Sequence, residues 1–160
     1  MHADLTLTFE RVVTATPAAI YRAWTTPEIM LQWLTPAPWR TIACEVELRP
    51  GGVFRSVMCS PDGVEVANVA CYLELVPNQK LVWTNALLPG FQPAPSAEGC
   101  GDFFLTVVIE LEPVSGGTRY RAKALHRDLE GMNKHAAMGF EQGWALALDQ
   151  MLALIAAGEV

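Results

Sequence analysis

Apolar and polar residues alternate along several segments of this chain, which is the pattern of a β-strand with one buried face. The alternation is clear near the start, where Leu5, Leu7, Phe9, Arg11 and Val13 share one face. Turns that contain proline or glycine separate most of the later segments. The sequence therefore predicts about seven strands, at residues 5–13, 42–48, 53–60, 65–76, 80–85, 103–112 and 118–126.

Two short helices are predicted between the first two strands. Thr16-Pro17 and Thr26-Pro27 each combine an N-cap residue with a proline at the first helical position. The first pair predicts a helix over about 18–25, and the second predicts a helix that runs from Pro27 toward Trp33. A long helix is predicted from residue 133 or 134 to 157, with a glycine as its stop. Its predicted apolar stripe is Ala137, Phe140, Trp144, Leu148, Met151 and Ile155, and its opposite, solvated face holds His135, Gln142 and Asp149.

Helices that are segregated from a run of antiparallel strands define an α+β fold. With 160 residues the chain has the length of one domain, so we expect residues 1–160 to form a single domain around one core. Residues 86–101 carry three prolines and three glycines without periodicity. This segment is predicted to be a long loop, either a lid over a site or a mobile connection.

The composition excludes several classes of protein. Hydrophobic residues make up 51% of the chain, too many for disorder, and no apolar run reaches the ~20 residues of a membrane-spanning helix. A net charge of −6 with only 11 Lys and Arg argues against nucleic-acid binding. No secretory signal is visible, so we expect a cytoplasmic protein. Its cysteines should be reduced thiols rather than disulfides or zinc ligands: Cys44, Cys59, Cys71 and Cys100.

A series of short motifs in a fixed order resembles one known superfamily. The motifs are Arg11 with Pro17, IYRAWTTPE at 20–28 with Trp33, ELRPGGVF at 47–54, LVWT at 81–84, and GFEQGW at 139–144 with LD at 148–149. Their order and distances resemble the SRPBCC superfamily, which has the START-like and birch-pollen-allergen-like helix-grip fold. Within it, the chain resembles the subgroup that shares the C-terminal domain of the activator of the Hsp90-type chaperone ATPase.

The resemblance covers nearly the whole chain and implies a fold more firmly than a function. It implies a seven-stranded antiparallel sheet wrapped around the C-terminal helix, with a cavity between them that often holds an apolar small molecule. Members of the superfamily include lipid carriers, hormone-binding proteins, polyketide cyclases and chaperone regulators. No single activity follows, because a fold does not determine a function.

Large apolar side chains are the candidates for the wall of such a cavity, since ligand sites are mostly apolar with a few placed polar groups. The alternative is that the same side chains simply fill the core. For Phe140 and Trp144, core packing with some exposure to the wall is the favoured interpretation. The candidate ligand-binding residues are Trp33, Phe54, Met58, Trp83, Phe103, Leu105, Tyr120, His126, Phe140 and Trp144.

Two polar residues have inward strand phases. His126 shares its phase with Tyr120 and should point toward the helix, where it could bind a ligand oxygen or move a proton; a hydrogen-bonded histidine at a strand end is favoured. Arg11 requires a carboxylate or carbonyl partner, or it orients the anionic end of a ligand, unless the strand twists outward there. No nucleophile, P-loop or HExxH motif is present, and neither a metal nor a cofactor is expected.

Three functions remain as hypotheses. The first is a cytoplasmic protein that binds a small apolar, aromatic or lipid-like molecule and performs no chemistry. The second is an enzyme of the polyketide cyclase or hydrolase type, with His126 as general acid or base and Arg11 or Tyr120 polarising a carbonyl. The third is a chaperone- or stress-related module that binds a protein partner. Neither nucleic acid nor membrane insertion is expected, and the chain is predicted to be a monomer or a homodimer.

Overall fold

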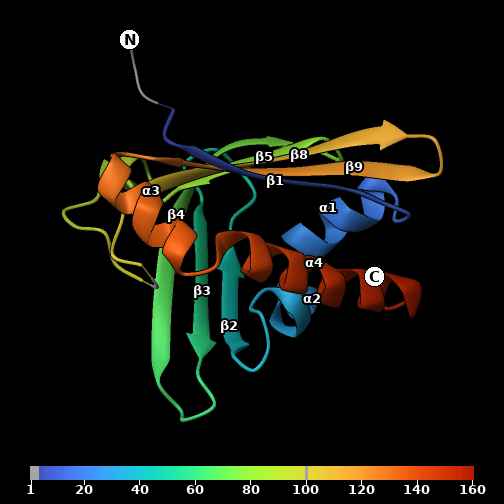
Figure 1. The fold of residues 1–160 in the computed structure, drawn as a ribbon, viewed down its shortest axis with the longest axis horizontal. Coiled ribbons are helices and arrows are strands. Elements are labelled where there is room, and N and C mark those ends of the chain that lie inside the picture. Colours follow the sequence, from blue (N-terminus) through green and yellow to red (C-terminus); the bar gives the residue numbers. More distant parts are fainter. Residues whose placement is uncertain (1–3, 100) are drawn as a thin grey trace.

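The main element of the fold is a seven-stranded antiparallel sheet in the order β1-β9-β8-β5-β4-β3-β2. The computed structural model describes residues 4–99 and 101–160 (Figure 1). It confirms the predicted α+β, helix-grip fold, and each strand end falls within two residues of the prediction. The strands are β1 (Thr6–Val13), β2 (Arg40–Val46), β3 (Val53–Cys59), β4 (Glu65–Val76), β5 (Lys80–Thr84), β8 (Leu105–Val114) and β9 (Gly117–His126).

The sheet is strongly curved. In Figure 1, β2, β3 and β4 run in a different direction from β1, β8 and β9, and the last helix crosses the concave side. The strand register shifts between Thr41 and Ala43 in β2 and between Tyr72 and Glu74 in β4. Such bulges bend a strand and increase its twist, so they allow the sheet to wrap around the helix.

Two short helices, α1 (Pro17–Thr25) and α2 (Pro27–Trp33), connect β1 to β2 as predicted. The Thr16 hydroxyl accepts a hydrogen bond from the backbone N–H of Ala19 at 3.1 Å and caps α1. At the end of α2, Trp33 Nε1 donates to the carbonyl of Ala23 at 3.1 Å. This bond ties the two helices together and fixes the Trp33 ring beside the concave face.

The prediction of one long C-terminal helix is wrong. The chain forms α3 (Leu129–Ala137) and α4 (Phe140–Ala156), which are separated at Gly139 with a φ of 88°. Glycine adopts this left-handed conformation without steric cost, so Gly139 ends α3 and redirects the chain. Helix α3 also starts earlier than predicted, at Leu129, where Asp128 caps it by accepting from the N–H of Gly131 at 2.8 Å. Because of the break, Ala137 is exposed rather than part of the inward stripe.

The segment 86–101 is not entirely a loop, which corrects a second prediction. It contains a small hairpin of β6 (Leu87–Leu88) and β7 (Gln92–Pro93). The N–H of Gly90, in the hairpin turn, donates to the carbonyl of Gly51 at 2.7 Å. The hairpin is therefore held against the turn between β2 and β3.

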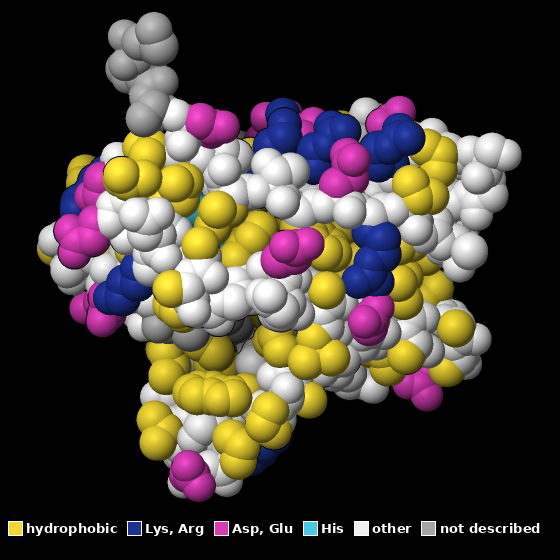
Figure 2. All heavy atoms as spheres, in the orientation of Figure 1, with side chains coloured by type: hydrophobic (Ala, Val, Ile, Leu, Met, Phe, Trp, Pro, Cys, Tyr) yellow, Lys and Arg dark blue, Asp and Glu magenta, His cyan; other side chains and the backbone are white. Residues whose placement is uncertain are grey.

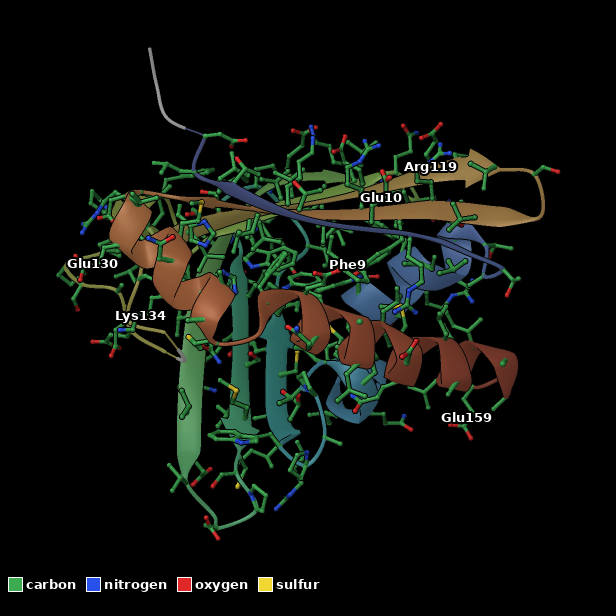
Figure 3. All side chains as sticks on the ribbon, viewed as in Figure 1. Phe9, Glu10, Arg119, Glu130, Lys134 and Glu159 are labelled. Carbon is green, nitrogen blue, oxygen red and sulfur yellow. The ribbon has the colours of Figure 1, made fainter. Side chains whose placement is uncertain are left out.

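The two faces of the sheet differ in the way the alternation predicts. Figure 3 shows Phe9 turned toward α4, whereas Glu10 and Arg119 lie on the outer side. On that outer side Arg121 pairs with Glu10 at 2.6 Å and Arg119 with Glu112 at 3.0 Å. Figure 2 shows Lys, Arg, Asp and Glu side chains gathered along one edge of the molecule. The apolar face is left for the core and for the space under α4.

Candidate functional site

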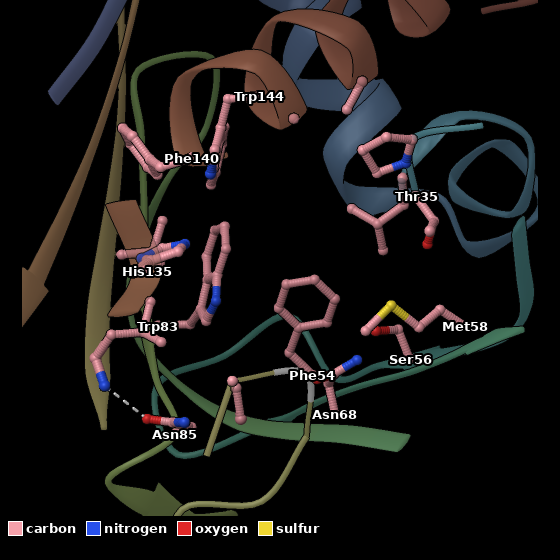
Figure 4. Close-up of a pocket in the computed structure, with 18 of the residues that line it drawn as sticks. Thr35, Phe54, Ser56, Met58, Asn68, Trp83, Asn85, His135, Phe140 and Trp144 are labelled. Atoms are coloured by element: carbon pink, nitrogen blue, oxygen red, sulfur yellow. Dashed lines mark hydrogen bonds between the residues drawn. The ribbon is translucent and has the colours of Figure 1, made fainter. Parts of the chain in front are cut away.

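A pocket of about 380 Å³ lies between the concave face of the sheet and the two C-terminal helices. In Figure 4 its wall is formed by side chains from the sheet on one side and from α3 and α4 on the other. Figure 2 shows hydrophobic side chains gathered below α3 and α4, beside the far ends of β3 and β4. The aromatic residues that line the pocket are Trp24, Trp33, Phe54, Trp83, Phe103, Tyr120, Phe140 and Trp144.

The structure brings together nine of the ten residues selected from the sequence as ligand-binding candidates, whereas His126 does not line the pocket. Their role in binding a ligand stays a prediction. The nine residues are Trp33, Phe54, Met58, Trp83, Phe103, Leu105, Tyr120, Phe140 and Trp144.

Trp24, which the sequence reasoning did not select, joins the aromatic wall. Its ring centroid lies 5.2 Å from that of Trp83 and 6.0 Å from that of Trp144, and it meets Trp33 edge-on at 4.7 Å. Phe54 completes the row with an edge-on contact to Trp83 at 5.0 Å. Such offset and edge-on pairs hold the rings in fixed orientations. The sequence signal for Trp24 is its place inside the IYRAWTTPE motif, which carries the family resemblance.

The polar side chains along the pocket are few, and most are engaged. Asn85 donates from Nδ2 to the carbonyl of Phe103 at 2.9 Å and accepts from the N–H of Leu105 at 2.8 Å, which fixes the start of β8. The buried Tyr120 hydroxyl accepts from Trp24 Nε1 at 3.2 Å. Glu98 is a carboxylate on the wall, and no lysine or arginine lies among the described lining residues. An anionic ligand would therefore meet no lysine or arginine among these described residues.

His126 and His135 form a hydrogen-bonded pair at one end of the pocket. His126 is buried at the end of β9, and its Nδ1 lies 2.9 Å from the carbonyl oxygen of Leu5. Its Nε2 lies 2.8 Å from His135 Nδ1. Both nitrogens of His126 are thus occupied, as the interpretation of a hydrogen-bonded strand-end histidine expects.

His135 corrects the prediction that this residue is solvated. The break at Gly139 rotates α3 relative to the predicted continuous helix, and His135 faces inward between Phe103 and Phe140, with ring centroids 4.8 and 5.1 Å away. Burial, with the neighbouring His126 as a smaller contribution, lowers the pKa of His135 to about 4. The imidazole on the pocket wall is therefore neutral near pH 7.

Arg11 has the acidic partner that its inward phase predicts. Its Nη1 lies 2.6 Å from Asp149 Oδ1 on α4, and its Nη2 donates to the carbonyl of Ala145 at 3.5 Å. Neither Arg11 nor Asp149 lines the pocket. The pair joins β1 to α4.

Other site types find little support within the described part of the chain. Cys44, Cys59 and Cys71 are free thiols, and Cys100 lies outside the described residues. Among residues 4–99 and 101–160, no group of three or more histidine, cysteine, aspartate or glutamate side chains could hold a metal ion. None of the helices in these ranges is long and apolar enough to cross a membrane.

The fold and the pocket define a helix-grip protein, and comparison with solved structures supports this class. The chain is similar to a crystal structure from Nitrosomonas europaea, with 36% identity, 99% of each chain covered and a TM-score of 0.90. It is similar to one from Chromobacterium violaceum at 25% identity, with 93% of this chain and 96% of that chain covered and a TM-score of 0.70. A crystal structure from Rhodobacter sphaeroides shares the fold at 23% identity, with 98% of this chain and 96% of that chain covered and a TM-score of 0.82.

The family follows from the sequence itself. Residues 14–156 match the profile of the family described as Activator of Hsp90 ATPase homolog 1-like protein. The chain therefore belongs to this family within the SRPBCC superfamily, which confirms the resemblance seen in its motifs. A comparison with curated proteins finds no match.

Proposed function

We propose that the protein binds a small hydrophobic molecule in the pocket between the sheet and α4. The observation that carries the proposal is the pocket itself, with a volume of about 380 Å³ and a wall of aromatic rings. Ligand sites of about 300–1,000 Å³ with mostly apolar walls and a few polar groups are typical of small-molecule binding.

The side chains on the wall support this function because several of them remain only half-buried. Met58, Trp83, Leu105 and Trp144 belong to this group although each is large and apolar. Their apolar surface would leave water when a ligand entered, which favours binding by about 25 cal/mol per Å². A pocket closed by its own side chains would offer no such gain.

The test is a titration with N-phenyl-1-naphthylamine, an uncharged fluorescent probe, after native mass spectrometry has identified any co-purifying small molecule. The variant Ser56→Phe places a ring on the pocket wall between Phe54 and Met58, as Figure 4 shows. We expect the unaltered protein to bind the probe and the variant to bind it at least about tenfold more weakly, which is about 1.4 kcal/mol.

A matched control keeps this result specific. Ser115→Phe introduces the same ring at the exposed turn between β8 and β9, which does not line the pocket. This variant should bind the probe like the unaltered protein. Equal binding by both variants, or no binding by the unaltered protein, would contradict the proposal.

The two other hypotheses remain predictions. Chemistry at His126 finds no support in the geometry, because both of its ring nitrogens are hydrogen-bonded and it does not line the pocket. Binding to a chaperone or another protein partner rests on the family alone.

A further inference from the structure

The histidine pair carries information about the ligand, because hydrogen bonds restrict where each imidazole can hold its proton. A neutral imidazole has one N–H donor and one bare nitrogen that accepts. A backbone carbonyl only accepts. Since His126 Nδ1 lies 2.9 Å from the carbonyl oxygen of Leu5, this nitrogen must carry the proton.

The proton positions then follow along the pair. When His126 holds a single proton, on Nδ1, its Nε2 is bare and accepts from His135 Nδ1, 2.8 Å away. His135 therefore holds its own proton on Nδ1, and its Nε2 is bare. Nε2 of His135 has no hydrogen-bond partner among the described residues, and the residue lines the pocket (Figure 4).

The surroundings keep this nitrogen an acceptor. Burial between Phe103 and Phe140, together with the nearby His126, disfavours the charged form of His135 and lowers its pKa to about 4. Among the described residues that line the pocket, the charged one is the exposed Glu98, and none is a lysine or an arginine. A ligand carboxylate would thus meet a bare nitrogen and no lysine or arginine among these residues.

We propose that the bare Nε2 of His135 selects, among small hydrophobic molecules, an uncharged aromatic compound with a hydroxyl donor, such as a phenol or a naphthol. This inference rests on the proposed function, since it names the ligand class for the same pocket. His126 acts as a positioning residue, because its bond to Leu5 sets the tautomer of its neighbour.

The tautomers can be observed directly, without a ligand. Long-range ¹H–¹⁵N NMR spectra of the histidine rings at pH 8 distinguish a protonated nitrogen from a bare one. We expect the Nδ1–H tautomer for both His126 and His135. An Nε2–H tautomer at His135 would overturn the inference, whatever the pocket binds.

Binding is tested with a matched pair of probes, 2-naphthol and 2-methoxynaphthalene. Both oxygens accept hydrogen bonds, but only the hydroxyl donates, so the difference isolates donation to His135. We expect 2-naphthol to bind about two- to tenfold more tightly than the ether, as for one neutral hydrogen bond. In His135→Phe, which keeps a ring of similar shape, this preference should disappear, and 2-naphthoate should bind more weakly than 2-naphthol to the unaltered protein.

The results separate this inference from the proposed function. If both naphthalenes bind equally well in the unaltered protein, and Ser56→Phe weakens both, the pocket binds hydrophobic molecules and the donor requirement is wrong. A preference for 2-naphthol that survives in His135→Phe would also overturn it. If neither compound binds, the proposed function fails together with the inference.

Discussion

The region between the sheet and α4 has two halves with similar apolar side chains, which are fully buried in one half and partly exposed in the other. In the half beside α1 and α2, Ile20, Met30, Ile109 and Met151 have no exposed surface. Around the pocket, which extends from α3 and the start of α4 to the segment after α2, Trp83, Met58 and Trp144 are only partly buried. We call these the closed half and the open half.

The difference shows that one sheet and one helix supply both a core and a site. In the closed half, α1 and α2 both pack against α4, and they also contact the sheet at β8 and β2. In the open half, the break at Gly139 turns α3 away from the axis of α4, and the pocket of about 380 Å³ lies between these two helices and the sheet. The closed half holds the fold together, and the open half is available to a ligand.

The largest expected effect is a difference in the free energy of unfolding between two methionine-to-alanine variants, one in each half. Met151→Ala in the closed half leaves a cavity in a fully buried core and should lower the free energy of unfolding by about 2–5 kcal/mol. Met58→Ala in the open half removes a side chain that already borders the pocket, and it should cost less than about 1 kcal/mol. Urea denaturation monitored by circular dichroism measures both. Equal losses would mean that the open half carries as much stability as the closed one.

A smaller effect concerns pH and His135 in the open half. The folded state holds the pKa of this residue at about 4, below its ordinary 6.5, so the unfolded chain takes up its proton first as the pH falls. The stability that neutral His135 contributes is present above about pH 6.5 and is lost progressively down to about pH 4. A full shift would correspond to about 3 kcal/mol, and since the ring is partly exposed we expect about 1–2 kcal/mol.

This contribution is measured as a difference between two proteins. Denaturation of the unaltered protein and of His135→Phe is followed at pH 7.5 and at pH 4, so that the titration of the carboxylates is shared by both. The unaltered protein should lose more stability over this interval. An identical loss in both would show that His135 is not held neutral by its surroundings.

The smallest effect is at the outer surface of α4, away from both halves. Asp149 is largely exposed and its pair with Arg11 is reached by solvent, so Asp149→Asn should cost about 0.2–1 kcal/mol. The loss should shrink at high salt, where exposed pairs are screened. Binding of N-phenyl-1-naphthylamine should not change. A loss above about 3 kcal/mol would instead place this pair among the buried contacts of the core.

The sequence predicted the strands well because their signal is local. Strand alternation depends on neighbouring residues, and the Thr16-Pro17 and Thr26-Pro27 starts are likewise read within a few positions. The C-terminal helices are harder to predict, because the apolar stripe of the predicted long helix continues across Gly139 and hides the break. The break at Gly139 could have been inferred from the preference of glycine for a helix end, but its φ of 88° is visible only in the structure.

The candidate site was predicted less completely for a physical reason. The pattern of a strand shows which side chains point inward, but whether they meet one another or leave a space depends on the curvature of the sheet and on the path of α3. Trp83 of the pocket and Ile109 of the core therefore look alike in the sequence. The sequence pattern does not predict the inward position of His135, because that position follows from the helix break. Its hydrogen bond to His126 joins a helix to a strand, which have different periodicities.

The tryptophans offer the most direct test of the claim that the open half is a ligand site. The chain has five tryptophans; Trp24, Trp33, Trp83 and Trp144 line the pocket, whereas Trp39 does not. Indole N–H resonances are recorded by ¹H–¹⁵N NMR, assigned with single Trp→Phe variants, during a titration with 2-naphthol. The account predicts saturable shifts of Trp83 and Trp144, which border the pocket with partly exposed rings, while Trp39 stays in place. Shifts confined to Trp39, or no shift in any indole, would contradict it.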